Sequence, residues 1–137
     1  MGCAISVLEL AVPVWHPGLT QSEVTQIERV QKTALHIILG TKYTSYNEAL
    51  KSVNLRPLEN RRENACLKFA KQTLRSPKFS TWFVKNTTPN HGIETRSKKM
   101  LLKPVTTRTV RYEKSAMPYL TELLNNCTWT EKERLFW

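Results

Sequence analysis

Aspartate is missing from this sequence: all 11 acidic residues among its 137 residues are glutamates. Sites that transfer phosphoryl groups with two metal ions hold those ions about 4 Å apart with compact carboxylates, most of which are aspartates. The absence therefore argues against polymerase and nuclease chemistry of this kind. It also excludes a Ser-His-Asp triad in its usual form and leaves only a variant with glutamate. No nucleophile, base and orienting group stand together in the sequence, so we expect no enzymatic activity, no cofactor and no metal site.

Cysteine and histidine are few and scattered. The three cysteines, at positions 3, 66 and 127, form no C-x-x-C pair, and the histidines lie at positions 16, 36 and 91. Neither a zinc site nor a disulfide framework is expected, and isolated thiols indicate a reducing, intracellular compartment, nuclear or cytoplasmic. Long apolar runs are missing as well. The segment Ala4–Trp15 is interrupted by Glu9 and Pro13 and is too short to span a bilayer.

What the chain has in excess is positive charge. Lysine and arginine number 21 against 11 acidic residues, which gives a net charge of +10. Such a surplus favours a polyanionic partner, either a nucleic acid or an acidic membrane surface. Composition alone leaves open a soluble basic protein that has no such partner.

The clearest periodic segment runs from Thr20 to Gly40. Thr20 with Glu23 three residues later forms a capping box, and Gly40 is a typical residue just beyond the C-terminus of a helix. Apolar residues recur between them at helical spacing and predict one buried stripe, formed by Val24, Ile27, Val30, Ala34, Leu35 and Ile38. Arg29 and Lys32 fall on the opposite, solvated face.

Two further patterns predict helices. Ser45 and Glu48 form a second capping box ahead of a short apolar face, made by Tyr46, Ala49, Leu50 and Val53. Pro57 then suits the first turn of a helix that continues to Ser76. The residues of this helix predicted to face inward are Leu58, Ala65, Cys66, Phe69, Ala70 and Leu74. Its remaining surface carries the basic residues Arg61, Arg62, Lys68, Lys71 and Arg75.

The pattern changes after residue 76. One more helical turn is expected around Phe79, Trp82 and Phe83, whereas residues 87–109 are polar, contain two prolines and lack a period. A helical pattern returns with Tyr119, Leu120, Leu123 and Leu124. We therefore expect an all-α fold. It comprises a small helical bundle over residues 4–85, an irregular basic linker over residues 86–110 and a short C-terminal helical extension over residues 111–137.

Several of these segments resemble, in their order and spacing, the region that follows the polymerase palm in reverse transcriptases of jockey-like and CR1-like non-LTR retrotransposons. The resembling stretches are SVLELAVPVWHPGL, the helix IERVQKTALHIILG, then TSYNEALKSVNLRPLENRRENACLKFAK and finally RTVRYEKSAMPYLTELLN. Together they cover roughly residues 6–125.

The resemblance implies a thumb-like bundle and its C-terminal extension without the catalytic palm, because the family's aromatic-x-Asp-Asp motif has no counterpart here. The chain is then expected to be a fragment or remnant of an RNA-directed DNA polymerase of a transposable element, beginning inside a core element of that enzyme. It would be inactive by itself and at most a weak, non-specific binder of primer-template duplexes through phosphate contacts. The candidate nucleic-acid-binding residues are Arg29, Lys32, Arg61, Arg62, Lys68, Lys71 and Arg75.

These residues also have structural explanations. Arg61 and Arg62 can solvate their helix or pair with Glu59 and Glu63. The tryptophans at positions 15, 82 and 129 are expected in the core or at helix caps rather than as base-stacking platforms. His16 is expected in a turn, and the histidine at position 36 at the boundary of the core.

Two other functions remain open. The N-terminal MGCAIS matches an acylation motif, with Gly2 exposed once Met1 is removed and Cys3 as a second lipid site. A lipid-anchored basic peripheral membrane protein is therefore one alternative. A helical protein-interaction module, domesticated from the element, is the other. It would bind through apolar residues once covered by the palm, which we expect in the segment Ala4–Trp15.

Overall fold

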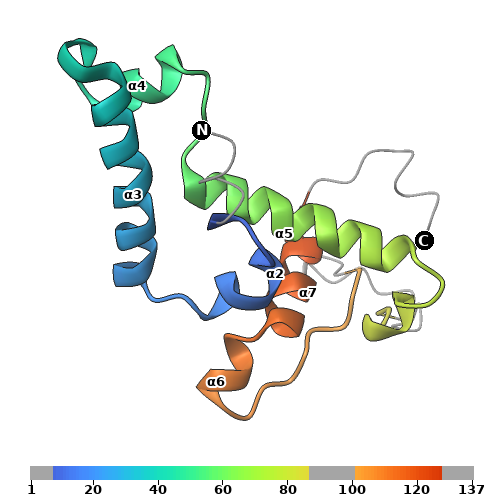
Figure 1. The fold of residues 1–137 in the computed structure, drawn as a ribbon. Coiled ribbons are helices and arrows are strands. Elements are labelled where there is room, and N and C mark those ends of the chain that lie inside the picture. Colours follow the sequence, from blue (N-terminus) through green and yellow to red (C-terminus); the bar gives the residue numbers. More distant parts are fainter. Residues whose placement is uncertain (1–7, 87–100, 128–137) are drawn as a thin grey trace, which may run out of the picture. The chain divides into compact units, whose positions relative to one another are not determined.

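The computed structural model describes residues 8–86 and 101–127 of the chain. These residues form helices joined by short loops, and no β-strand occurs among them (Figure 1). The predicted all-α fold is therefore confirmed. The α-helices are α2 (Val12–Trp15), α3 (Gln21–Leu39), α4 (Tyr46–Ser52), α5 (Leu58–Arg75), α6 (Val110–Glu113) and α7 (Ala116–Asn126). The 3-10 turns are η1 (His16–Gly18), η2 (Gly40–Lys42) and η3 (Ser80–Trp82).

The chain divides into two compact units, residues 1–66 and residues 67–137. The division falls within α5, so the first half of this helix belongs to one unit and its second half to the other. The domain boundaries predicted from the sequence, after residues 85 and 110, stay a prediction.

Helix α3 begins where the capping box predicts. The backbone N–H of Glu23 donates to the Oγ1 atom of Thr20 (3.4 Å), and the backbone N–H of Thr20 donates to the Glu23 carboxylate (2.7 Å). The hydrogen bond from the Thr20 backbone holds the pKa of Glu23 below its usual value, and the bond from the Thr20 hydroxyl adds to this. At the other end Gly40 has a φ of 51°, a left-handed conformation that glycine adopts without steric strain.

The buried face of α3 differs from the predicted stripe. Val24, Gln31 and Leu35 are buried. Val30 and Ile38, which the periodicity assigns to the same stripe, are 52% and 56% exposed. The prediction is wrong for these two residues because α3 has apolar side chains on more than one side, and its tertiary neighbours cover only the side of Leu35.

Helix α4 packs against the C-terminal part of α3 (Figure 1). As predicted, Ala49 and Leu50 are buried, and they form a core cluster with Leu35. Partly buried apolar residues surround this cluster: Leu39, Tyr43, Tyr46, Val53 and Leu55. The backbone N–H of Glu48 donates to Ser45 (3.3 Å), so the predicted cap is present. The Glu48 carboxylate accepts a hydrogen bond from the Thr44 hydroxyl.

Glu28 on α3 links three helices of the first unit. Its Oε1 atom accepts hydrogen bonds from the Tyr46 hydroxyl on α4 and from the backbone N–H of Leu58 (3.1 Å). Its Oε2 atom accepts one from the backbone N–H of Glu59 (3.3 Å). These two N–H groups belong to the first turn of α5, where amides lack intrahelical partners and negative charge is favourable. Because Pro57 offers no side-chain acceptor, α3 supplies the cap that the sequence before α5 lacks.

Helix α5 spans the predicted residues, and its buried side follows a spacing of four. Leu58, Arg62, Cys66 and Ala70 are each fully buried. Phe69, predicted to face inward, is 40% exposed because it lies about 100° around the helix from Ala70. Burial raises the pKa of the Cys66 thiol to about 11, and the Glu63 charge adds to this.

The second unit brings separate pieces of chain together. Phe83, directly after η3, is buried. The backbone N–H of Asn86 donates to the Leu101 carbonyl (3.0 Å), and that of Lys103 donates to the Val84 carbonyl (2.8 Å). A short antiparallel pairing therefore connects the predicted linker, residues 86–110, to the end of the predicted bundle.

Leu102, in the middle of this pairing, is fully buried. Its backbone N–H donates to Oδ1 of Asn125 (2.9 Å), and its carbonyl accepts from Nδ2 of the same side chain (3.2 Å). Asn125 belongs to α7, whose Leu120 and Leu124 are buried in agreement with the predicted apolar pattern. The described part of the predicted linker is therefore packed at Leu102.

Candidate nucleic-acid interface

The structure describes all seven basic residues predicted to bind nucleic acid: Arg29 and Lys32 on α3, and Arg61, Arg62, Lys68, Lys71 and Arg75 on α5. Most of them reach solvent, and Lys71 and Arg61 are half-buried. Arg62 is buried. The seven residues therefore differ in their exposure to solvent. Arg61 and Arg62 each have an environment of their own.

Arg61 forms an ion pair with Glu9. Its Nε atom lies 2.9 Å from Oε1 of Glu9, and one of its terminal nitrogens donates to Oε2 at 3.1 Å. The pair thus combines one hydrogen bond to Oε2 with a close charge contact at Oε1, which itself accepts no hydrogen bond among the described residues. The partner is not Glu59 or Glu63, which the sequence suggested, but a residue 52 positions away. Arg61 therefore ties the segment before α2 to α5, and a phosphate would have to displace Glu9.

Arg62 lies in the interior, and the prediction that it lies on the solvated surface is wrong. None of its surface is exposed, and its Nε atom donates to Nδ1 of His16 at 3.4 Å. His16 is buried in η1, the turn in which the sequence placed it. Burial lowers the pKa of His16, and the charge of Arg62 lowers it further. The neutral imidazole is therefore the form that accepts this hydrogen bond.

The spacing of the sequence contains a signal for the burial of Arg62. The residue lies four positions after Leu58 and four before Cys66, on the line of α5 that is buried. Residues four apart lie on the same side of a helix. The sequence prediction placed Arg62 at the surface because arginine side chains are usually exposed, although its position on the helix indicates burial.

Three cations in the second half of α5 share one side of the helix. Lys68, Lys71 and Arg75 follow at spacings of three and four residues, which places them in a row about 10 Å long. Lys68 and Arg75 are exposed and Lys71 is half-buried. A row of this length spans two to three nucleotides of one strand, taking about 3.4 Å per nucleotide. The row fits phosphate contacts of the kind that the sequence predicts.

Two aromatic rings follow this row directly. The Ser76 carbonyl accepts hydrogen bonds from the backbone N–H groups of Phe79 (3.1 Å) and Ser80 (2.8 Å), so the chain turns back after α5. The rings of Phe79 and Trp82 lie 5.0 Å apart at an angle of 55°, and Trp82 is 52% exposed. Lys78 places its Nζ atom 5.4 Å from the centre of the Phe79 ring.

The sequence predicts Trp82 in the core or at a helix cap; its exposure excludes the core, and it lies at the end of η3. The adjacent Phe83 takes the buried position, and Trp82 remains at the surface. The sequence prediction did not include Lys78 and Phe79 as candidate site residues, and it disfavoured base stacking by Trp82. The signal that could have found them is the combination of one lysine and three aromatic residues in KFSTWF, since surfaces that bind single-stranded nucleic acid combine positive charge with aromatic rings.

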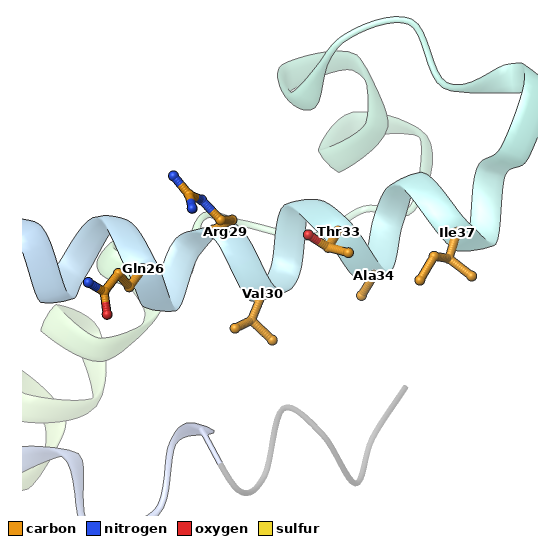
Figure 2. Close-up of a pocket in the computed structure, with 6 residues that line it drawn as sticks. All are labelled: Gln26, Arg29, Val30, Thr33, Ala34 and Ile37. Atoms are coloured by element: carbon orange, nitrogen blue, oxygen red, sulfur yellow. The ribbon is translucent and has the colours of Figure 1, made fainter.

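Arg29 and Lys32 belong to the first unit and have a different environment. Both are exposed and lie one turn apart. Arg29 borders a shallow hollow on α3 together with Gln26, Val30, Thr33, Ala34 and Ile37. Figure 2 shows Val30, Ala34 and Ile37 projecting to the same side of α3, whereas the Arg29 side chain projects to the other side of the ribbon in this view. This mixture of apolar and cationic groups differs from the cationic row on α5.

The structure bears on lipidation, metal binding and membrane insertion only within the residues that it describes. Gly2 and Cys3, the predicted lipidation sites, lie outside residues 8–86 and 101–127. Within these ranges no cluster of histidine, cysteine and glutamate could hold a metal ion. Helices in the same ranges are too short or too polar to cross a bilayer.

Comparison of the chain with known proteins gave no match to a protein-family model, to a curated protein or to a solved structure. The resemblance to non-LTR reverse transcriptases stays a prediction that rests on the sequence motifs alone.

Proposed function

We propose that this chain binds nucleic acid without sequence preference, through the second half of α5 and the aromatic turn that follows it. Lys68, Lys71 and Arg75 contact phosphates, and the Trp82 ring stacks on an unpaired base. The observation that carries the proposal is the succession, within one unit, of a cationic row and an exposed aromatic pair.

The chemistry of these groups supports binding without base selection. Lysine and arginine on a helix contact the phosphates, which are the same for every sequence. An aromatic ring stacks on any base, because every base has a π-face. Binding by the thumb remnant of a non-LTR reverse transcriptase would have this character, and we propose that origin for the chain, without catalytic activity of its own.

Fluorescence anisotropy with a labelled RNA–DNA hybrid that ends in a single-stranded overhang tests the proposal. The association constant is measured between about 50 and about 300 mM salt, where loss of phosphate contacts appears as a smaller slope of log K against log salt. The triple variant Lys68→Gln, Lys71→Gln, Arg75→Gln is expected to reduce this slope by about 2 to 3, since each contact contributes about 0.9.

A matched control removes the same charge from another part of the second unit. Arg108, Arg111 and Lys114 are exposed, so the triple substitution of these residues by glutamine lowers the net charge equally. This control is expected to leave most of the slope unchanged. Equal losses in both triple variants would show that only total charge matters, and absence of binding by the unaltered chain at the lowest salt would reject the proposed function.

A further inference from the structure

A second apolar face of α3 lies opposite its buried side. Val24, Gln31 and Leu35 mark the buried side. The residues that line the hollow, centred on Val30 and Thr33, lie on average about 180° around the helix from Leu35 at 3.6 residues per turn. Val30 is 52% exposed and Ile37 is 75% exposed. Among the described residues, this face is therefore not covered by the tertiary contacts of α3.

The lining residues have the spacing of a helix-packing surface. Val30, Thr33, Ala34 and Ile37 stand at positions i, i+3, i+4 and i+7, and Gln26, Arg29, Val30 and Thr33 repeat the same spacing one turn earlier. Four residues in this arrangement form the hole that receives one side chain of a facing helix in knobs-into-holes packing. The small side chains of Thr33 and Ala34 leave the hollow between Val30 and Ile37 (Figure 2). α3 thus presents two successive holes, the second of them apolar.

The charges beside these holes have one sign. The two carboxylates of α3 are engaged elsewhere: Glu23 caps its own helix, and Glu28 caps α5 and accepts from Tyr46. Arg29 is exposed at the flank of the first hole. Among the described residues, no acidic side chain lines either hole.

We infer that this face of α3 binds an amphipathic helix of a protein partner that carries acidic residues along its flanks. One apolar side chain of the partner enters the hole formed by Val30, Thr33, Ala34 and Ile37, and a flanking carboxylate pairs with Arg29. The face from Gln26 to Ile37 is about 16 Å long, which matches about three turns of the partner helix. This site differs from the nucleic-acid surface on α5 and does not depend on it.

The observations favour this occupant over two others. A second copy of the chain would bring a net charge of +10 and a second Arg29 to the same contact, and like charges oppose such pairing. An anionic lipid surface would match the charge, but it carries no side chains that could enter the two holes. Both alternatives are outcomes of the experiment below.

The probe is a labelled synthetic peptide of three heptads with leucine at positions a and d and glutamate at positions e and g, whose like charges disfavour its own pairing. A matched peptide has lysine at e and g. Fluorescence anisotropy with the full chain is expected to show saturable binding of the glutamate peptide, at least about five times tighter than that of the lysine peptide. If neither peptide shows saturable binding, the inference is overturned.

Two pairs of variants localise the contact. Ile37→Gln is expected to weaken binding about tenfold, whereas Ile38→Gln, which removes the same type of exposed side chain outside the holes, changes it less than about twofold. Arg29→Glu is expected to reverse the preference between the two peptides, while Lys32→Glu, with the same change in net charge, preserves it. Equal effects within either pair overturn the inference, because they indicate an unspecific apolar or electrostatic contact.

Further measurements distinguish the other occupants. Circular dichroism is expected to give unchanged helicity for all four variants, since each replaced side chain is exposed. Sedimentation velocity that shows dimers lost in Ile37→Gln would overturn the inference in favour of a second copy. The chain could instead float with phosphatidylserine vesicles, lose this flotation in Ile37→Gln and bind neither peptide. That result would overturn the inference in favour of a lipid surface.

Discussion

The Nε atom of Arg62 lies 3.4 Å from Nδ1 of His16, and both side chains are buried. Among residues 8–86 and 101–127, the two terminal nitrogens of Arg62 have no hydrogen-bond partner. Within the part of the chain that the structure describes, this guanidinium is thus enclosed with a neutral acceptor and forms no ion pair with a carboxylate. A buried charge in this situation reduces stability.

Replacement of Arg62 by methionine, which retains an unbranched apolar stem, is therefore expected to stabilise the protein by about 1 to 3 kcal/mol. Urea unfolding followed by circular dichroism measures the change. Arg61→Met serves as the contrasting variant, because it leaves Glu9 half-buried without its ion-pair partner and is expected to destabilise. A loss of stability in Arg62→Met would show that the guanidinium makes stabilising contacts.

Stability is expected to decrease below about pH 6.5 because of His16. Burial and the Arg62 charge lower its pKa from the usual 6.5, so the unfolded chain takes up the proton at a higher pH than the folded chain. The free energy of unfolding is then unaffected by this group above pH 6.5 and decreases as the pH falls towards the lowered pKa. Urea titrations from neutral to mildly acidic pH measure this decrease.

Two variants assign the pH dependence to His16. His16→Gln is expected to flatten the profile in this range, whereas His36→Gln, at an exposed position of α3, is expected to preserve it. Arg62→Met is expected to make the free energy of unfolding fall less steeply with decreasing pH, because the charge of Arg62 is removed. The contribution from the burial of His16 remains. A profile that His16→Gln does not alter would contradict the assignment.

Removal of the Glu28 carboxylate is expected to destabilise the contact among α3, α4 and α5. Glu28→Ala eliminates the hydrogen bonds to the N–H groups of Leu58 and Glu59 and to the Tyr46 hydroxyl, and we expect a loss of about 2 kcal/mol. A double-mutant cycle with Tyr46→Phe, measured by urea unfolding, is expected to give a coupling energy of about 1 kcal/mol. Additive effects would show that the hydroxyl and the carboxylate act independently.

Exposed aromatic stacking predicts a preference for single strands that depends on Trp82. Trp82→Leu is expected to weaken binding of a single-stranded oligonucleotide by 1 to 3 kcal/mol, that is about 5- to 150-fold, and to affect a blunt duplex much less. Tyr112→Leu, at another exposed aromatic of the second unit, is the control. Anisotropy titrations in which both substrates lose equal affinity would contradict stacking by Trp82.

Features that depend on neighbouring residues in the chain are predictable from this sequence. The capping box at Thr20 and Glu23, the end of α3 before Gly40 and the apolar face of α4 all follow from spacings of three or four residues. Each is decided by local hydrogen bonds or by a single helix face, which the sequence displays directly.

Features that depend on distant partners are not predictable in the same way. α3 has apolar residues on opposite sides, and the choice of Leu35 over Val30 as a buried residue is made by α4 and by the first turn of α5. The pairing of Arg61 with Glu9 and the burial of Arg62 against His16 join residues 52 and 46 positions apart. Periodicity cannot identify such partners, because it describes one helix at a time.

Asn125 gives the second unit a property that its helical content conceals. Its amide group offers Leu102 one acceptor and one donor, the same pair that a peptide group of a neighbouring strand would offer. The backbone groups of Leu102 that point away from the antiparallel pairing are thereby occupied. An unoccupied pair of this kind is a point at which an extended segment of another molecule can add by hydrogen bonding. The side chain of Asn125 therefore protects the unit against edge-to-edge association at Leu102, and aspartate, which lacks the donor, could provide only half of that protection.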